Sequence, residues 1–214
     1  GVMEGLIERY SGRTVLVLGA HPDDGEVGAG GTIARLTRAG ARVLLTAVSA
    51  PKDLEKRAAE ARAAAEVLRA EPLLLVNDRP CRLEDLKTSE LVAQLDALVC
   101  EYRPAALFTH ARDETHWDHF LLSRAVLGSM RLGPCEVFLF NNTVHRNPCQ
   151  AWRPNLWIDI TSTIGVKLEA IAAHESQFGA RGKDTSVFRE VARTHGRAPG
   201  APYAEAFEIL RLNG

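Results

Sequence analysis

The chain has 214 residues, of which 46% are hydrophobic and 25% charged, and its formal net charge at pH 7 is -1. This composition is typical of a globular protein with a sizeable core, and the near-neutral charge excludes a protein that holds nucleic acid through a broad basic surface. No apolar run approaches the roughly 20 residues of a membrane-spanning helix, and no signal peptide is apparent, so we expect a cytoplasmic protein without a membrane or nucleic-acid partner.

The first third of the chain predicts a βαβ unit. Residues 14–18 form a short apolar run rich in β-branched side chains, which is typical of a strand buried on both faces of a parallel sheet. A glycine-rich turn is expected next, followed by a helix over residues 31–39 that Gly40 ends. Residues 42–48 are the second predicted strand. A crossover of this kind is almost always right-handed.

The alternation of strands and helices continues along the chain. Further strands are predicted over residues 72–76, 105–109, 136–140 and 156–160, with a late strand or edge segment over 205–210. Further helices are predicted over residues 53–69, 89–102, 120–130 and 162–174. The pattern predicts an α/β fold, a Rossmann-like three-layer fold with a mostly parallel central sheet. Without an internal repeat or a linker, residues 1–214 are expected to form a single domain.

Two polar clusters follow two of the predicted strands. Residues 21–26 (HPDDGE) come directly after the strand at 14–18, and residues 110–119 (HARDETHWDH) come directly after the strand at 105–109. Ligands of open α/β sheets bind beyond the carboxyl ends of the strands. The sequence therefore places imidazole and carboxylate groups together where a ligand is expected.

Histidine and carboxylate at two strand ends are the ingredients of a metal site. Catalytic zinc usually takes three protein ligands from His, Asp or Glu and keeps one position open for water. His21 and Asp24 can come from one turn, and His119 is the best candidate for the third ligand.

Three neighbouring residues have types that suit the chemistry of such a site. Asp23 is placed to take a proton from a metal-bound water as general base. His116 is placed to donate a hydrogen bond to the oxyanion that forms, and Asp118 to orient a histidine.

Each cluster also has a purely structural interpretation. Asp23 and Asp24 precede a helix and favour its N-terminus, and residues 116–119 can be a capping turn. The glycines at 25, 28, 30 and 31 suggest an alternative function, a nucleotide-binding regulatory Rossmann-type module without a catalytic metal. Their spacing departs from G-x-G-x-x-G, however, and the aspartates before them would repel phosphate.

These motifs resemble the LmbE-like, or PIG-L, family of zinc-dependent N-deacetylases. Residues 20–32 are close to the family's A-H-P-D-D-x-x-x-G-x-G-G-T motif, and residues 116–119 resemble its H-x-D-H element. Weaker matches are residues 166–170, 174–177 and 203–207, together with Arg57, Glu60 and Ala64. The resemblance spans nearly the whole chain.

The resemblance implies a role for each residue of the motifs. His21, Asp24 and His119 correspond to the ligands of one zinc ion per chain, and Asp23 to the general base. His116 corresponds to the residue that stabilises the oxyanion or protonates the leaving amine.

The resemblance also implies a reaction. It is hydrolysis of an N-acyl bond, most often an acetyl group, on a small molecule such as an N-acetylglucosamine-type amino sugar, its conjugate or a natural-product intermediate. Members of the family commonly form oligomers, so a homo-oligomer is also expected.

Other residues of interest have two interpretations. Arg57 contacts substrate in relatives, but its helix is rich in charge and a solvated face is the alternative. Asp78 follows a predicted strand and either bonds a sugar hydroxyl or is a turn residue beside Pro80. Trp117 replaces the family's proline and is expected to change the pocket wall, whereas His174 is expected to be structural.

The cysteines are few and scattered. No C-x-x-C pair occurs, so neither a disulfide framework nor a zinc knuckle is expected, and each thiol is predicted to be a small buried hydrophobe. They are Cys81, Cys100, Cys135 and Cys149.

Overall fold

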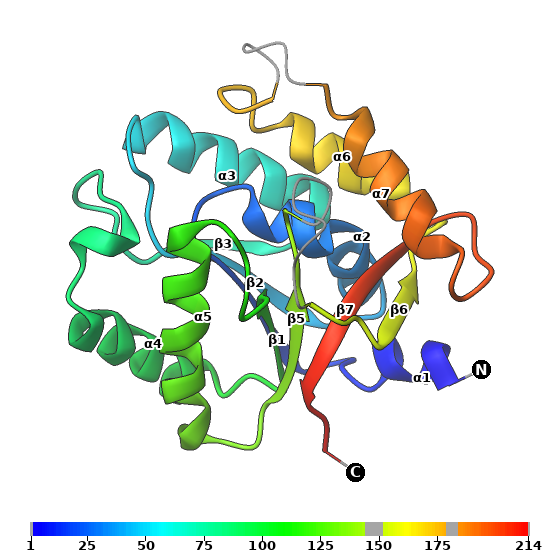
Figure 1. Cartoon of the computed structure of the whole chain (residues 1–214), viewed down its shortest axis with the longest axis horizontal. Coiled ribbons are helices and arrows are strands. Elements are labelled where there is room, and N and C mark those ends of the chain that lie inside the picture. The colour runs from blue at the N-terminus through cyan, green and yellow to red at the C-terminus, as the bar shows by residue number, and fades with distance from the viewer. Residues whose placement is uncertain (1, 144–151, 179–183, 214) are drawn as a thin grey trace.

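The computed structural model of the chain describes residues 2–143, 152–178 and 184–213 (Figure 1). Its centre is a seven-stranded sheet with the order β3-β2-β1-β4-β5-β7-β6. The strands are β1 (Thr14–Gly19), β2 (Arg42–Ala47), β3 (Glu71–Leu74), β4 (Ala106–His110), β5 (Glu136–Phe140), β6 (Leu156–Asp159) and β7 (Ala204–Arg211). Strands β1 to β5 are parallel, and β7 runs antiparallel to both of its neighbours. The predicted fold class is confirmed.

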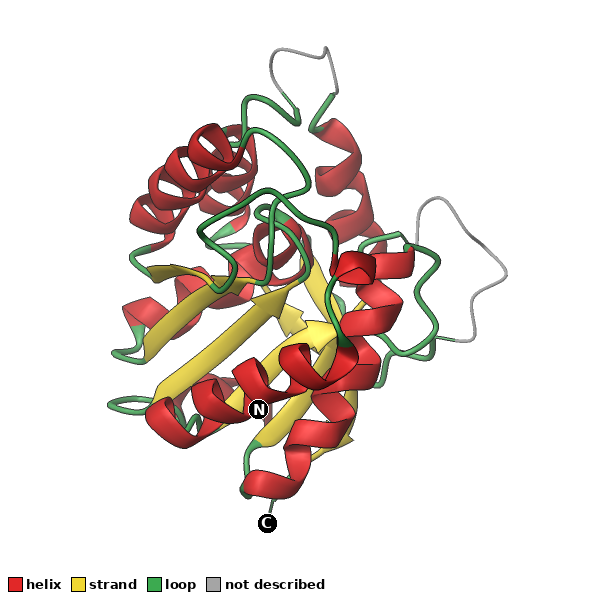
Figure 2. Cartoon of the chain, turned by 90° about the vertical axis from the view of Figure 1, so that its left-hand side faces the viewer, coloured by secondary structure: helices red, strands yellow, loops and turns green. Residues whose placement is uncertain are grey.

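Helices cover both faces of the sheet (Figure 2). On one face lie α1 (Val2–Glu8), α2 (Asp24–Arg38), α3 (Leu54–Leu68), α6 (Ile164–Ala172) and α7 (Ser186–Gly196), and on the other lie α4 (Thr88–Tyr102) and α5 (Trp117–Ser129). Short 3-10 helices occur at η1 (Leu83–Asp85) and η2 (Met130–Leu132). Among the described residues, no helix has the length and apolar character needed to cross a membrane.

Strand β1 shows why the strands are apolar throughout. Val15 and Val17 pack into the core on the α2 side, whereas Leu16 and Leu18 pack into the core on the α4 and α5 side. All four side chains are at most 1% exposed. A strand buried on both faces needs apolar residues at every position, which is what the continuous run of residues 14–18 predicts.

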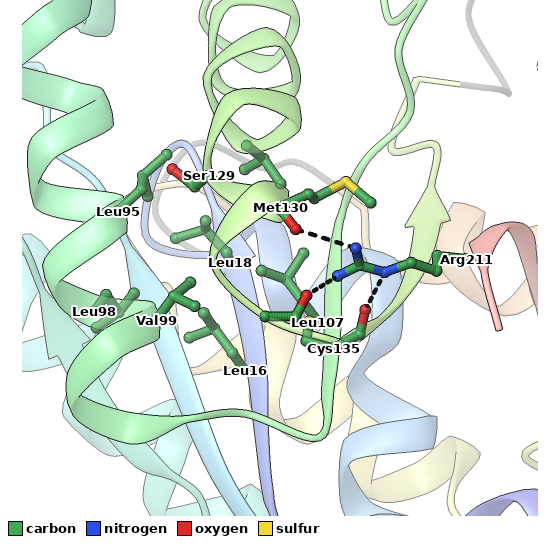
Figure 3. A pocket seen from close by; sticks show the side chains of 12 residues that line it. Leu16, Leu18, Leu95, Leu98, Val99, Leu107, Ser129, Met130, Cys135 and Arg211 are labelled. Carbon is green, nitrogen blue, oxygen red and sulfur yellow. Dashed lines mark hydrogen bonds between the residues drawn. The ribbon is translucent and has the colours of Figure 1, made fainter. Parts of the chain in front are cut away.

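The core beneath α4 and α5 contains one small apolar cavity (Figure 3). Its volume is about 20 Å³, and leucines such as Leu16 and Leu107 line it. Arg211 at its rim donates to the carbonyl oxygens of Cys135 (2.6 Å), Met130 (3.0 Å) and Gly133 (2.7 Å). These three hydrogen bonds attach the end of β7 to the segment between α5 and β5.

Helix α2 begins earlier than the sequence predicts, at Asp24. The expected glycine-rich turn is therefore wrong, because the glycines lie inside the helix. They permit close packing: a Cβ atom on Gly28 would lie 2.4 Å from the Phe140 ring, and one on Gly31 would lie 2.7 Å from Ile160. These glycines therefore let helix α2 pack closely against Phe140 and Ile160, and they do not form an open loop.

Helix α2 is interrupted at Ala29, whose φ of -143° and ψ of 15° are not helical. The Glu205 carboxylate of β7 accepts hydrogen bonds from the backbone N–H groups of Gly31 (2.9 Å) and Thr32 (2.7 Å) just after the break. Lys167 of α6 donates to Glu205 (2.6 Å) and to a carbonyl oxygen before the break (2.7 Å). A buried ion pair therefore satisfies the backbone groups that the kink frees.

Several other expectations differ from the structure. Residues 205–210 form a strand as predicted, but β7 lies between β5 and β6 and is not an edge. Helix α1 and helix α7 were not predicted at all. Cys81 and Cys135 are buried, but Cys100 is exposed because it lies on the outer face of α4, and Cys149 lies outside the described residues.

The ion pair at the kink generates a stability prediction. We expect Glu205→Gln to lower the free energy of unfolding by about 3–5 kcal/mol, because it leaves the buried Lys167 ammonium without its charged partner. Adding Lys167→Met should recover part of the loss. Urea denaturation measures both effects. The control is Glu208→Gln on the same strand, whose partner Arg112 is 45% exposed, and its cost should not exceed about 1 kcal/mol. Equal losses for the two glutamates would contradict the prediction.

Candidate active site

The two polar clusters meet because β1 and β4 are adjacent parallel strands. Leu18 pairs with Thr109, so the chain leaves both strands at the same edge of the sheet. The backbone N–H of Ala20 donates to Nε2 of His110 (3.1 Å), which ties the two strand ends together.

Asp24 lies at the centre of the site and is 5% exposed. Its Oδ1 is 3.2 Å from Nε2 of His119, and its Oδ2 is 3.2 Å from Nε2 of His110. The backbone N–H of His21 donates to Oδ2 (2.8 Å), and the side-chain amide of Asn142 donates to Oδ1 (3.3 Å). One carboxylate thus connects the segments that follow β1, β4 and β5.

His21 lies between two carboxylates. Its Nδ1 is 3.8 Å from Oδ2 of Asp24, and its Nε2 is 2.7 Å from Oδ2 of Asp118. The same Asp118 oxygen accepts a hydrogen bond from the backbone N–H of Leu83 (3.2 Å). Asp118 therefore fixes the orientation of the His21 ring.

His119 also has a carboxylate on its far nitrogen, and this partner was missed in the sequence. Nδ1 of His119 is 2.9 Å from Oε1 of Glu114, and Nδ1 of His110 is 2.8 Å from Oε2 of the same side chain. The two imidazole rings stack with their centroids 3.8 Å apart. Glu114 belongs to the second polar cluster, but only the folded loop shows that it faces both rings.

The residues present fit a metal ion. His21, Asp24 and His119 converge, and each imidazole has its other nitrogen against a carboxylate, the arrangement that orients histidine ligands in metal sites. Among the described residues, the sets of three whose ligand atoms all lie within 4.8 Å of one another are two; both contain His119, and each includes one further member of this trio. They are His21, His116 and His119, and Asp24, His110 and His119.

Opposite charges shift the titration of these groups. Burial opposes ionisation of Asp24, but the charges of His119 and His110 outweigh it and hold the pKa of Asp24 well below its usual value. Burial also disfavours the charged form of His119 and so lowers its pKa, but the nearby carboxylates of Asp24 and Glu114 outweigh burial and raise the pKa to about 10. Despite burial, the pKa of Glu114 falls to about 2 because of His110 and His119.

Asp23 differs from these carboxylates. It is the N-cap of α2 in a left-handed conformation, with a φ of 106°, which is uncommon for a residue other than glycine. Burial, and then the charge of Asp24, raise the pKa of Asp23 to about 6, although Arg57 acts in the opposite direction. Asp23 can therefore take up and release a proton near neutral pH.

Arg57 of α3 supports the turn that carries Asp23. Its guanidinium donates to the Pro22 carbonyl, and Nη2 is 3.5 Å from Oδ2 of Asp23. Arg57 is 5% exposed, so the alternative interpretation as part of a solvated helix face is wrong.

His116 is the N-cap of α5 and also faces the site. Its Nδ1 accepts a hydrogen bond from the backbone N–H of Asp118 (3.2 Å), and its ring stacks on His119 with a centroid distance of 4.4 Å. Burial, followed by the nearby His119 and His21, lowers the pKa of His116. The capping and site interpretations are therefore both compatible with its position.

A cavity of about 290 Å³ opens above these residues. Its lining includes the five polar residues His21, Asp23, Asp24, His116 and His119. It also includes Phe178 and Phe188, which meet edge to face with centroids 5.4 Å apart. The cavity thus combines reactive polar groups with an aromatic pair.

The segment that carries Phe178 is held by two buried glutamates. Nε2 of His174 is 2.7 Å from Glu26 of α2, and Glu60 of α3 accepts hydrogen bonds from the backbone N–H (2.8 Å) and the hydroxyl (2.7 Å) of Ser176. The position of His174 agrees with a structural role, because it anchors the segment without lining the cavity.

Two residues singled out in the sequence lie away from the cavity. Asp78 is exposed and pairs with Arg79 (3.3 Å). Trp117 is 57% exposed and stacks on Phe120 with centroids 5.3 Å apart. It is not among the described residues that line the cavity.

Comparisons with known proteins agree with this arrangement. The family model for PIG-L, GlcNAc-PI de-N-acetylase, matches residues 16–130. The diacetylchitobiose deacetylase of Thermococcus kodakarensis is 26% identical over 226 residues, which cover 92% of this chain and 83% of that protein.

Solved structures share the fold over nearly the whole chain. A conserved protein of Thermus thermophilus matches with a TM-score of 0.77 at 25% identity, covering 94% of this chain and 97% of that one. The 4-carboxy-2-hydroxymuconate hydratase of Pseudomonas putida matches with a TM-score of 0.78 at 22% identity, covering 94% and 98%.

The converging side chains predict metal binding. We expect the purified protein to bind about one zinc ion per chain, and His21→Ala or His119→Ala to remove most of it. Elemental analysis after dialysis against zinc measures this. The control is Asp113→Asn, a change at an exposed position of the same loop, which should retain the ion. Full occupancy in both histidine variants would contradict the ligand assignment.

The protonation of His119 predicts how metal affinity depends on pH. Without an ion, the pKa of His119 is about 10, so the ring is doubly protonated near neutral pH. An ion at Nε2 must displace one proton, so zinc affinity should rise about tenfold per pH unit between about pH 6 and pH 8. Competition with a chelator of known affinity at each pH measures the slope. An affinity that is constant over this range would disprove the linkage.

Proposed function

The chain belongs to the PIG-L family, GlcNAc-PI de-N-acetylase, and we propose that it is a metal-dependent hydrolase that removes an N-acyl group from an amino sugar or an amino-sugar conjugate. The observation that carries the proposal is that His21 and His119 both face Asp24 and that all three residues line one cavity. All three lie within the residues that match the family model. We further propose that the chain acts as one domain.

We propose that His21, Asp24 and His119 hold the metal and that the ion is zinc. Two imidazoles and one carboxylate are a common ligand set of catalytic zinc. When bound, the ion would polarise the amide carbonyl and acidify a water molecule. Asp118 and Glu114 hold the two histidine rings in the orientation that ligation needs.

Asp23 is the proposed general base. It lines the cavity next to Asp24, and its raised pKa suits a group that accepts a proton near neutral pH. Asp23 takes the proton from the attacking water as the new bond to the carbonyl carbon forms. It returns that proton to the nitrogen as the C–N bond breaks, so that the products are a carboxylic acid and a free amine, and the acid then passes its remaining proton to the amine or to solvent.

His116 is the proposed hydrogen-bond donor to the carbonyl oxygen. Because Nδ1 accepts a hydrogen bond from the backbone of Asp118, the neutral ring carries its proton on Nε2. The lowered pKa keeps the ring neutral, so Nε2–H is the group free to donate to the oxyanion.

The substrate class follows from the cavity and from the relatives. The Thermococcus relative is named as a deacetylase of diacetylchitobiose, an amino-sugar compound. In this chain, the aromatic pair Phe178 and Phe188 offers an apolar surface to the carbon face of a sugar ring. We therefore propose an N-acetylated amino sugar bound with its amide toward His116 and Asp23.

Release of a free amine tests the proposal. The zinc-loaded protein should release equal amounts of amine and acetate from N-acetylglucosamine or N,N'-diacetylchitobiose. Asp23→Asn should lower kcat by about 10² to 10⁴ while the metal content is unchanged, because it removes the proton acceptor without removing a ligand.

The control for this experiment is Asp78→Asn, whose side chain lies outside the cavity and whose kcat should equal that of wild type. O-acetyl analogues show whether an ester is the preferred substrate. Wild-type activity in the metal-loaded Asp23→Asn protein would refute the assignment of the base. A fully loaded wild type that releases no amine from either sugar would refute free N-acetylated amino sugars as substrates and leave their conjugates.

A further inference from the structure

Glu114 is the most completely enclosed carboxylate of the site. Its side chain is 0% exposed, and each of its oxygens faces a different imidazole. Oε1 lies 2.9 Å from Nδ1 of His119, and Oε2 lies 2.8 Å from Nδ1 of His110. Within the described part of the chain, no arginine or lysine side chain shares this carboxylate with the two rings.

The far nitrogens of both rings face Asp24. Nε2 of His119 is 3.2 Å from one oxygen of Asp24, and Nε2 of His110 is 3.2 Å from the other. The rings stack with an interplanar angle of 15°. Glu114, His110, Asp24 and His119 thus form a closed ring of four side chains, in which neither imidazole can rotate without breaking contacts at both ends.

This ring joins three elements of the fold. Asp24 is the first residue of α2, His110 is the last residue of β4, and His119 lies in the first turn of α5, with Glu114 in the loop between β4 and α5. Nε2 of His110 also accepts a hydrogen bond from the backbone N–H of Ala20, the residue that follows β1. The Glu114 carboxylate therefore contacts the imidazole of His119, which faces the proposed metal position. It also contacts the imidazole of His110, whose hydrogen bond with Ala20 holds the segment that leads to His21.

We propose that Glu114 is a positioning residue that selects the ring orientation and the proton location of His119 and His110. The inference rests on the proposed metal site. Oε2 of Glu114 is hydrogen-bonded to Nδ1 of His110, and Oε1 lies 2.9 Å from Nδ1 of His119. In the zinc-loaded protein, this negative charge beside both Nδ1 atoms favours a proton on Nδ1 of each neutral imidazole. Nε2 of His119 then has its lone pair free for the metal, and Nε2 of His110 has its lone pair free for Ala20.

Replacement by glutamine is a sharp test because it keeps the shape of the side chain. A glutamine has one accepting oxygen and one donating amide nitrogen, so it can accept from only one of the two rings. The other imidazole must place its proton on Nε2. At His119 this blocks the nitrogen that faces the metal, and at His110 it removes the acceptor for the Ala20 N–H.

The experiment measures metal affinity separately from activity. We expect Glu114→Gln to weaken zinc binding by about 10- to 100-fold in competition with a chromophoric chelator, and to change the visible absorption spectrum of the cobalt-substituted protein. The control is Asp113→Asn, one residue away and exposed, which should leave the affinity and the spectrum unchanged. Wild-type affinity together with a wild-type spectrum in Glu114→Gln would overturn the proposal.

A measurement on the wild type keeps the test independent of whether the variant folds. In long-range ¹H–¹⁵N spectra of the zinc-loaded protein, His119 and His110 should both carry their proton on Nδ1. A proton on Nε2 of His110 would overturn the proposal. A protein that binds zinc and shows both Nδ1 protons but releases no amine would contradict the proposed function while supporting this inference.

Discussion

The site depends on one constraint, the carboxylate of Asp24 held between two imidazoles, one at the end of β4 and one in the first turn of α5. Asp24 begins α2, whereas His110 ends β4 and His119 begins α5. These elements meet only because β1 and β4 are adjacent and parallel, so that their carboxyl ends point the same way. Interactions with the two histidines favour the ionised form of Asp24 and hold its pKa well below the usual value despite its burial, which would otherwise be costly.

Much of the remaining structure serves to bring α2 close to this point. Glycines let the helix approach Phe140 and Ile160 without a clash, and the buried pair of Lys167 and Glu205 satisfies the backbone at the kink. Glu26, on the same helix, binds His174 and thereby anchors the segment that leads to the aromatic wall of the cavity. The same helix therefore positions Asp24 in the cavity lining and, through His174, the segment that carries Phe178.

The fold alone does not determine the chemistry. A hydratase shares it with a TM-score of 0.78, as does a conserved protein from Thermus thermophilus with a TM-score of 0.77. What separates activities on such a scaffold is the set of side chains beyond the strand ends. In this chain the set comprises His21, Asp23, Asp24, His116 and His119, and it is the set on which the proposed metal-dependent hydrolysis rests.

The sequence by itself determined the strands, the α/β class and the two polar clusters, because these follow from local apolar runs and from the rule that ligands bind beyond the strand ends. It misplaced the start of α2, because glycines that favour a turn locally are required by close packing against distant residues. It could not reveal Glu114 as the partner of two histidines, nor the exposed position of Asp78. Those depend on side-chain directions that only the packed tertiary structure decides.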